Sequence, residues 1–396
     1  MNAQQWSFDE VIDRSKTQSV KWDSFENDLL PLWVADMDFR APQPIIKAII
    51  QRAEHGIYGY TYYPSSYYDV LLKWFKRRYN WVIKKKWLVF TPGVISAINL
   101  TIQAFSNPGD KIIVQNPVYY PFYGAIQTNG RRILLNPLKL LNGRFQMDFE
   151  DLEQKIKDPR AKLLILCSPH NPVGRVWIMD ELTQLGELCI ENGIRIIADE
   201  VHCDLIYPGY KHTNFASISE KFAQNSITCT SASKTFNVPG LQLSNIIIPN
   251  QKLWQTFNSS LESVFLPEKY GYLPNTLSIV AIQAAFEKCE DWLDSLILYL
   301  RDNLEFLKSF INKNLPQINI IEPEGTYLVW LDFRKLGMTS IQLDTFLRER
   351  AKVILDEGYK FGQGGKGFER INIACPRSIL EEALNRIYNA VINLEN

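Results

Sequence analysis

Four side chains able to do acid–base or carbonyl chemistry occur in this chain where strand-like runs end. Asn171 follows an apolar run, Asp199 ends the next run, and Lys234 follows the one after that, with His202 three residues beyond Asp199. The intervals of 28 and 35 residues each match one strand–helix–strand unit. Because functional groups gather at the carboxyl ends of parallel strands, we expect these four side chains to converge.

An anion site is predicted at the start of the helix-like segment 90–105, "FTPGVISAINLTIQAF". Gly93 opens this helix, so the N–H groups of Val94 and Ile95 have no partner within it. The positive end of the helix dipole lies at the same place. A phosphate group is the typical ligand of such a site.

Three further residues extend this set. Ser231 and Ser233, in "SASK", can add hydroxyl donors for a phosphate, and Tyr119, in "NPVYYPFY", presents a ring that can stack on a flat ligand. Taken singly, each residue fits an ordinary turn, cap or surface position. Together they meet the needs of pyridoxal phosphate: a lysine for its aldehyde, an acid for its pyridine nitrogen, and donors for its phenolate and phosphate oxygens.

Composition and charge narrow the class of protein. The chain has 396 residues, and 43 Lys plus Arg balance 43 Asp plus Glu. This balance predicts no nucleic-acid or membrane partner, and neither a secretory signal nor a membrane-spanning run is evident. Six cysteines are scattered without CxxC pairs, which predicts reduced thiols, no metal site and a cytoplasmic location.

Two patterns of elements divide the chain. From about 90 to 250, helix-like stretches alternate with runs that are apolar on successive residues, which predicts an α/β domain with a mainly parallel, buried sheet. After about 285 the pattern changes to a smaller α+β unit, against which the first forty-odd residues pack. We predict a large cofactor-binding domain at 45–285 and a small domain made of 1–44 and 286–396. The strand-like runs lie at 111–117, 162–169, 194–200, 226–232, 244–250, 326–333 and 370–376.

Several long phrases resemble the class I/II aminotransferase family of fold type I pyridoxal-phosphate enzymes. The resemblance covers nearly the whole chain and is strongest to the cystathionine β-lyase-like C–S lyases of the MalY/PatB type. It implies a seven-stranded, mainly parallel sheet and a homodimer. The phrases are "KWD" (21–23), "LWVADMDF" (32–39), "NPGDKIIVQNPVYYPF" (107–122), "CSPHNPVGRVW" (167–177), "SASKTFNVPGLQLSNIIIPN" (231–250), "PEGTYLVWLDFR" (323–334) and "RINIACPRS" (370–378).

The resemblance assigns roles around the cofactor ring. It implies that Lys234 is the Schiff-base lysine and that Asp199 is the partner of the pyridinium nitrogen. It also implies that Asn171 and His202 face the phenolate oxygen and that Tyr119 stacks on the ring.

The resemblance also assigns the phosphate and substrate contacts. The N–H groups that follow Gly93, with Ser231 and Ser233, are expected to hold the phosphate. Arg370 is expected to take the substrate α-carboxylate in a two-pronged pair, beside Asn171. Tyr60, in "YGYTYY", is expected to reach the phosphate of the neighbouring subunit.

Two departures from ordinary aminotransferases favour the lyase branch. His202 stands where many of them have a tyrosine, and Gln242 stands where most carry an arginine eight residues after the lysine. We therefore predict a C–S β-lyase that converts L-cystathionine or related cysteine S-conjugates to thiol, pyruvate and ammonia. An aminotransferase, or a lyase-like protein with an added regulatory role, remains the alternative at this point.

Overall fold

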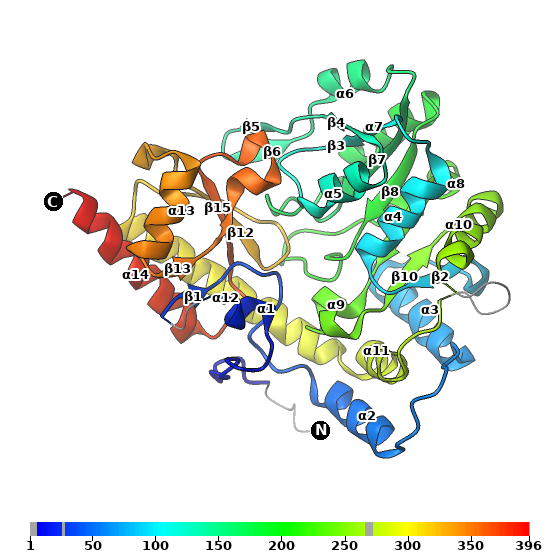
Figure 1. Ribbon diagram of the computed structural model, residues 1–396, viewed down its shortest axis with the longest axis horizontal. Helices are drawn as coiled ribbons and strands as arrows, with labels where there is room; N and C mark the ends of the chain where they lie inside the picture. The colour runs from blue at the N-terminus through cyan, green and yellow to red at the C-terminus, as the bar shows by residue number, and fades with distance from the viewer. Residues whose placement is uncertain (1–5, 26–27, 266–271, 396) are drawn as a thin grey trace.

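Two larger sheets, each covered by helices, organise the chain in the computed structural model, which describes residues 6–25, 28–265 and 272–395 (Figure 1). The first five residues of the N-terminal stretch that lacks a signal pattern lie outside this description. Active-site side chains are positioned mainly by the larger sheet. The smaller sheet and the N-terminal segment close the site from the other side.

The larger sheet has seven strands in the order β2-β10-β9-β8-β7-β3-β4. Only β10 runs antiparallel to its neighbours, and the other ladders are parallel. The predicted seven-stranded, mainly parallel sheet is therefore confirmed. Its strands are β2 (Leu88–Thr91), β3 (Lys111–Val114), β4 (Arg132–Leu135), β7 (Ala161–Cys167), β8 (Arg195–Asp199), β9 (Ser226–Thr230) and β10 (Ser244–Ile247).

Both faces of this sheet are buried, which explains why its strands are apolar on successive residues. Ile196 and Ile197, neighbours on β8, belong to different hydrophobic cores. One core includes side chains of α4 (Val94–Phe105), α5 (Pro121–Thr128) and α10 (Gln251–Val264). The other includes side chains of α6 (Phe149–Lys155), α7 (Met179–Glu191) and α8 (Glu220–Gln224).

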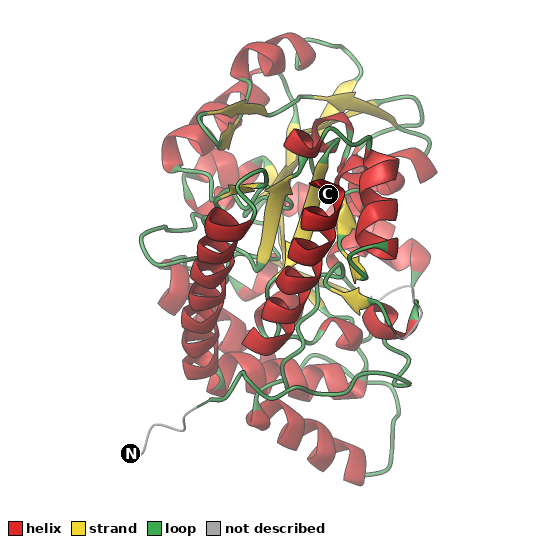
Figure 2. Ribbon diagram, turned by 90° about the vertical axis from the view of Figure 1, so that its left-hand side faces the viewer, coloured by secondary structure: helices red, strands yellow, loops and turns green. Residues whose placement is uncertain are grey.

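The smaller sheet is antiparallel and has the order β11-β12-β15-β14. Two long helices, α12 (Glu290–Asn314) and α14 (Arg377–Glu395), lie side by side in front of its strands in Figure 2. The strands are β11 (Asn319–Ile321), β12 (Leu328–Asp332), β15 (Phe368–Asn372) and β14 (Asp356–Glu357).

The N-terminal segment packs against this half of the molecule. Its strand β1 (Leu30–Pro31) pairs in parallel with β13 (Val353–Ile354). The other elements are α1 (Val20–Asp23), α2 (Gln43–Glu54), α3 (Ser65–Tyr79), the hairpin of β5 (Lys139–Leu141) and β6 (Arg144–Gln146), α9 (Ala232–Thr235), α11 (Thr276–Lys288) and α13 (Ser340–Glu349). Among the described residues, no helix combines the length and the apolar character needed to cross a membrane.

Candidate active site

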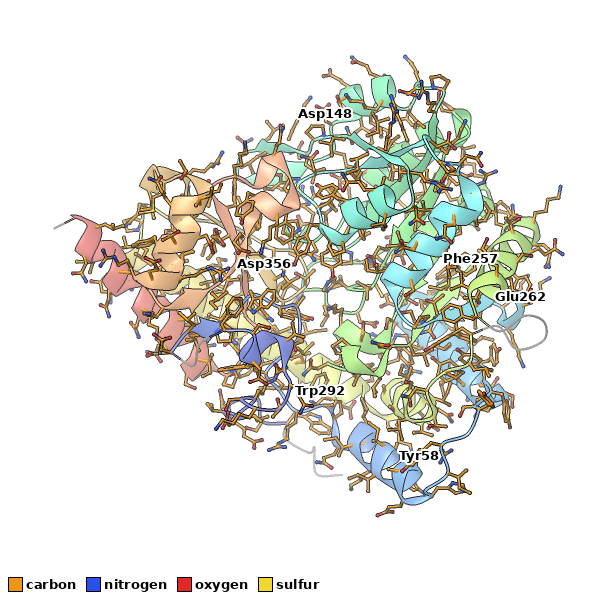
Figure 3. All side chains as sticks on the ribbon, viewed as in Figure 1. Tyr58, Asp148, Phe257, Glu262, Trp292 and Asp356 are labelled. Carbon is orange, nitrogen blue, oxygen red and sulfur yellow. The ribbon has the colours of Figure 1, made fainter. Side chains whose placement is uncertain are left out.

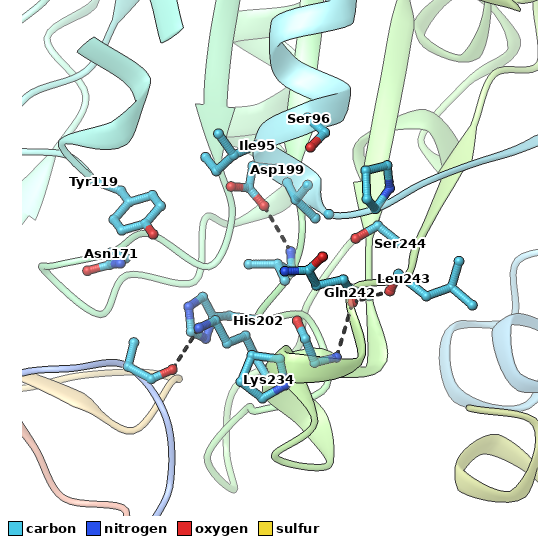
Figure 4. Close-up of a pocket in the computed structure, with 18 of the residues that line it drawn as sticks. Ile95, Ser96, Tyr119, Asn171, Asp199, His202, Lys234, Gln242, Leu243 and Ser244 are labelled. Atoms are coloured by element: carbon cyan, nitrogen blue, oxygen red, sulfur yellow. Dashed lines mark hydrogen bonds between the residues drawn. The ribbon is translucent and has the colours of Figure 1, made fainter. Parts of the chain in front are cut away.

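A cavity of about 200 Å³ lies at the edge of the larger sheet where β7, β8 and β9 end (Figure 4). The sequence-predicted residues converge there, with the exception of Arg370, which lies one contact away, and Tyr60. Those that line the cavity are Gly93, Val94, Ile95, Tyr119, Asn171, Asp199, His202, Ser231, Ser233 and Lys234.

Lys234 projects from the short helix α9, directly after β9. Its Nζ donates a hydrogen bond to the backbone carbonyl of Ala35 at 2.6 Å. Removal from water, together with the positive charge of Arg370, lowers the pKa of Lys234 to about 8. The amine is therefore available in its neutral form near physiological pH, as a nucleophile or general base requires.

Asp199 ends β8 and is almost fully buried. Its Oδ1 accepts a hydrogen bond from the backbone N–H of Val201 at 3.1 Å. Within the described ranges, no cationic side chain forms an ion pair with it, and burial raises its pKa to about 7. A cation bound next to this carboxylate would return it to its ionised form.

Two neutral polar groups flank the cavity between Asp199 and Arg370. His202 is buried, its Nδ1 has no hydrogen-bond partner among the described residues, and its ring lies edge-on to Tyr327 with centroids 5.8 Å apart. Burial and the nearby cations hold the pKa of His202 well below its usual range, so the imidazole is neutral. Asn171 accepts from Arg370 Nη1 through Oδ1 at 2.9 Å, and its amide N–H groups, which bond to no described residue, can donate to a ligand oxygen.

The N-terminus of α4, where the sequence predicts an anion site, lines the cavity. No side chain caps this helix, and its first intrahelical bond runs from the N–H of Ala97 to the carbonyl of Gly93 at 3.2 Å. The N–H groups of Val94, Ile95 and Ser96, which line the cavity, therefore have no partner within the helix.

The two predicted serine donors differ in the structure. The Ser231 hydroxyl donates to the carbonyl of Leu243 at 2.8 Å and accepts from the N–H of Ser233 at 3.1 Å, so it acts as the cap of α9. The Ser233 hydroxyl makes no hydrogen bond to any described residue. Of the two, Ser233 is the better placed to donate to a ligand.

Arg370, on β15, is already engaged at one end of its guanidinium. Its Nη2 donates to the carbonyl of Trp33 at 2.8 Å and to Asp356 Oδ2. Its Nε is buried and has no partner among the described residues. The guanidinium lies beside Asn171, as the expected carboxylate site requires, but its fork is shared with an internal carboxylate that the sequence did not reveal.

The segment 33–38, called the strap below, was missed by sequence reasoning. The carbonyl of Ala35 accepts from both Lys234 Nζ and the Tyr327 hydroxyl, the latter at 2.9 Å. Asn372 Nδ2 donates to the strap carbonyls of Val34 at 2.7 Å and Asp36 at 2.6 Å. The phrase "LWVADMDF" marked this segment, but contacts made by backbone carbonyls leave no signal in residue type.

Ion pairs fix the far end of the strap. Asp38 accepts from Lys21 Nζ at 2.6 Å, from Arg14 Nη1 at 2.6 Å and from Trp22 Nε1 at 2.9 Å. Lys21 is fully buried. Because an uncompensated buried charge is costly, this cluster holds the strap against the active site.

Tyr60 lies outside the cavity. Its side chain is 94% exposed, on the loop between α2 and α3, and nearby Tyr58 and Tyr62 are exposed as well. Within its own chain, Tyr60 therefore does not reach the anion site.

The residues present fit pyridoxal phosphate. A helix N-terminus with free N–H groups and the Ser233 hydroxyl suit its phosphate, and a buried carboxylate without a cation, Asp199, suits its ring nitrogen. The unpartnered nitrogen of His202 and the amide of Asn171 suit polar ring substituents, and the amine of Lys234 suits its aldehyde.

Comparisons with known proteins agree with this geometry. The family model described as "Aminotransferase class I and II" matches residues 27–387. Cystathionine beta-lyase PatB of Bacillus subtilis (strain 168) is 44% identical over 97% of this chain and 100% of its own. Protein MalY of Escherichia coli (strain K12) is 33% identical over 98% of this chain and 99% of its own.

Among solved structures, cystalysin from Treponema denticola, which contains a pyridoxal 5'-phosphate cofactor, superposes with a TM-score of 0.95. It is 39% identical over 98% of this chain and 100% of its own.

Proposed function

The chain belongs to the aminotransferase class I and II family, and from that premise we propose that it is a pyridoxal-phosphate-dependent carbon–sulfur β-lyase. Its substrate is a small amino acid, L-cystathionine or a related cysteine S-conjugate, and its products are a thiol, pyruvate and ammonia. The observation that carries this proposal is the cavity in which Lys234, Asp199 and the start of α4 meet. It occurs in a chain that resembles a cystathionine β-lyase over its full length.

When bound, pyridoxal phosphate supplies an electron sink for the negative charge that develops at the substrate Cα. In the proposal, Asp199 faces its ring nitrogen, Asn171 and His202 face its phenolate oxygen, and Tyr119 stacks on its ring. The N–H groups at the start of α4, with Ser233, hold its phosphate.

Lys234 is the proposed general base. Its lowered pKa, about 8, keeps a useful fraction of the amine neutral, and a base so placed removes the Cα proton. The proton then resides on Nζ, where the carbonyl of Ala35 can accept a hydrogen bond from it. Positioning by this carbonyl keeps the amine in place between proton transfers.

The sulfur at Cβ leaves as a thiolate, which must gain a proton. The protonated Lys234 can return one. Burial also raises the pKa of Tyr119, so its hydroxyl stays protonated at neutral pH and can act as a second proton donor. Arg370 and Asn171 hold the α-carboxylate during these steps.

The proposal includes a homodimer and a cytoplasmic location. A fully exposed Tyr60 is what a residue needs if it acts in a neighbouring subunit, and it lies beside exposed Tyr58 and Tyr62. The six cysteines are buried and unpaired, as expected in a reducing compartment.

The reaction type is tested by supplying L-cystathionine with no keto acid and following many turnovers. Elimination predicts that pyruvate, ammonia and thiol accumulate in equal amounts. Transamination converts the cofactor to its amine form and needs a keto acid for each further cycle. Product release that stops after one equivalent, or requires added keto acid, would replace the lyase by an aminotransferase.

A further inference from the structure

We propose that Asp356 is a positioning residue that controls the charge of the substrate-carboxylate site and takes up a proton when a carboxylate binds to Arg370. The inference rests on the proposed function, which assigns that carboxylate to Arg370. Asp356 lies on the side of the smaller sheet that faces the middle of the molecule (Figure 3).

The pair is built into the sheet. Asp356 on β14 stands directly opposite Arg370 on β15 in the antiparallel register. Asp356 Oδ2 accepts from Arg370 Nη2, and both side chains are almost completely buried. Two polar atoms of the same pair, Asp356 Oδ1 and Arg370 Nε, have no partner among the described residues. The pair is therefore in contact but not fully satisfied.

The other cationic side chains near Asp356 are already paired with a carboxylate, so they do not compensate the charge of a second anion. Lys360 and Arg348, the latter at 2.6 Å, are engaged by Glu357, the neighbour of Asp356 on β14. Burial and nearby carboxylates raise the pKa of Glu369 well above its usual range, which favours its neutral form. The other titratable groups that face Asp356 are Tyr119 and Tyr120, whose raised pKa values keep them neutral.

Arg370 is the cation in contact with Asp356, whereas Lys360 acts on it only through space, so an incoming carboxylate must share Arg370 with Asp356. Ionised Asp356 and Arg370 sum to zero charge, so a bound carboxylate would leave one buried negative charge without compensation, which is unfavourable. Burial has already raised the pKa of Asp356, and a second anion raises it further. Proton uptake by Asp356 removes the excess charge and releases Arg370 Nη2 for the ligand.

The coupling gives the site a direction. A carboxylate binds more tightly as the pH falls, by up to tenfold per pH unit while one proton is taken up. When the product leaves, Asp356 loses its proton and returns to Arg370. An ionised Asp356 therefore competes with a bound carboxylate and assists its release.

The test uses 3-(methylthio)propionate, a thioether carboxylate without an amino group, added to the holoenzyme. Calorimetry in buffers with different ionisation heats counts the protons taken up between pH 6 and pH 9. We expect a maximum close to one proton for the wild-type protein. In Asp356→Asn, which retains the hydrogen-bond acceptor but not the charge, we expect that uptake to vanish and the affinity at pH 8 to rise about tenfold.

Asp332→Asn is the matched control. Asp332, the last residue of β12 beside β15, is also a buried carboxylate paired with an arginine, and its Oδ2 accepts from Nη2 of the half-exposed Arg334 at 2.7 Å. This variant should leave proton count and affinity unchanged. Proton uptake that persists in Asp356→Asn, or weaker binding there with an unchanged pH slope, would overturn the inference and reduce Asp356 to a structural support.

Two further measurements keep the outcome decisive. Should Asp356→Asn fail to fold, the absence of proton uptake by the wild-type protein across this pH range would overturn the inference by itself. Arg370→Ala separates the inference from the proposed function. Undiminished binding in Arg370→Ala would show that Arg370 does not bind the carboxylate. If Arg370→Ala loses binding but the wild-type protein and Asp356→Asn take up equal numbers of protons, only the coupling is refuted.

Discussion

Lys234 has a lowered pKa, and its Nζ donates a hydrogen bond to the backbone carbonyl of Ala35, which holds it in place. We expect Lys234→Ala to lower kcat by at least about 10²–10⁴-fold, the usual contribution of a well-placed general base. The phosphate and ring contacts do not involve this side chain, so the variant should still bind the cofactor. Absorbance spectra of the dialysed protein measure cofactor retention, and a lyase assay measures kcat.

Chemical labelling checks the same assignment independently. Borohydride should fix the cofactor to the wild-type chain at Lys234, as identified by peptide mapping. For the activity measurement, the control is Lys221→Ala, which alters an exposed lysine and should retain full activity. Label on a different lysine would show that the assignment is wrong.

Asp199 predicts a difference between the free and cofactor-bound protein. Its folded pKa, about 7, lies above that of an exposed aspartate, so ionisation destabilises the cofactor-free protein. The resulting loss of unfolding free energy is small below about pH 4 and grows between about pH 4 and pH 7. It reaches its full value, about 4 kcal/mol, above pH 7. Cofactor-free Asp199→Asn should therefore melt at a higher temperature than wild type at pH 8, with a smaller gap at pH 5.

The cofactor-bound protein should show the opposite order. Without the charge of Asp199, the cofactor ring nitrogen loses the partner that keeps it protonated. We expect weaker cofactor binding and a fall in kcat much larger than any change in KM. A variant with near-normal kcat, or one less stable than wild type when cofactor-free at pH 8, would refute the role given to this carboxylate.

Site residues could be predicted from the sequence where their side chains make the contacts, and not where backbone groups make them. Lys234, Asp199, Asn171 and His202 could be assigned to one edge because side chains at strand ends converge by topology. The acceptor at Ala35 is a backbone carbonyl, which any residue provides. Asp356 belongs to a two-residue strand with no periodic pattern, so nothing in the sequence linked it to Arg370.

At the scale of elements, the start of α4 supplies only neutral donors to the anion site. Gln242 lines the same cavity, in a left-handed conformation with φ 48°. We expect Gln242→Arg to tighten cofactor binding about 10–100-fold, because a hydrogen bond from a charged donor contributes about 1.5–3 kcal/mol. The rate of cofactor loss during dialysis measures the effect.

A matched variant separates the position from the added charge. Gln224→Arg introduces the same residue at an exposed position on α8, away from the cavity, and should leave cofactor loss at the wild-type rate. Equal rates for Gln242→Arg and wild type would show that the phosphate does not approach residue 242.

Elements were predicted well where the hydrophobic period is clear. The five apolar runs of the larger sheet became β3, β7, β8, β9 and β10, because burial on both faces requires apolar residues in succession. The strap has no such period. Its position depends on the buried Lys21–Asp38 pair and on Asn372, residues that are distant in sequence, and such pairings follow only from the folded structure.

At the scale of the whole molecule, the fold agrees with the sequence prediction, and the domain limits at 45–285 and at 1–44 with 286–396 stay a prediction. The subunit arrangement also stays a proposal. Tyr58, labelled in Figure 3, lies at the periphery of the chain, and Tyr60, two residues further along the same loop, is exposed. This placement suits a loop that contributes to a neighbouring subunit. If the protein is a homodimer, the activity of mixed dimers can be predicted.

The expectation concerns mixtures of two inactive variants. If Tyr60 acts across a two-fold interface, a dimer of one Lys234→Ala subunit and one Tyr60→Ala subunit has one intact site, because the intact lysine and the intact tyrosine meet there. Random exchange makes half of the dimers mixed, so activity should recover to about a quarter of the wild-type value. Mixing Lys234→Ala with Asp199→Asn is the control: both residues act within their own chain, so no intact site can form. Activity of the first mixture that stays at the mean of its two components would place Tyr60 outside the neighbouring site, and a fully active monomer in sedimentation experiments would refute the shared site altogether.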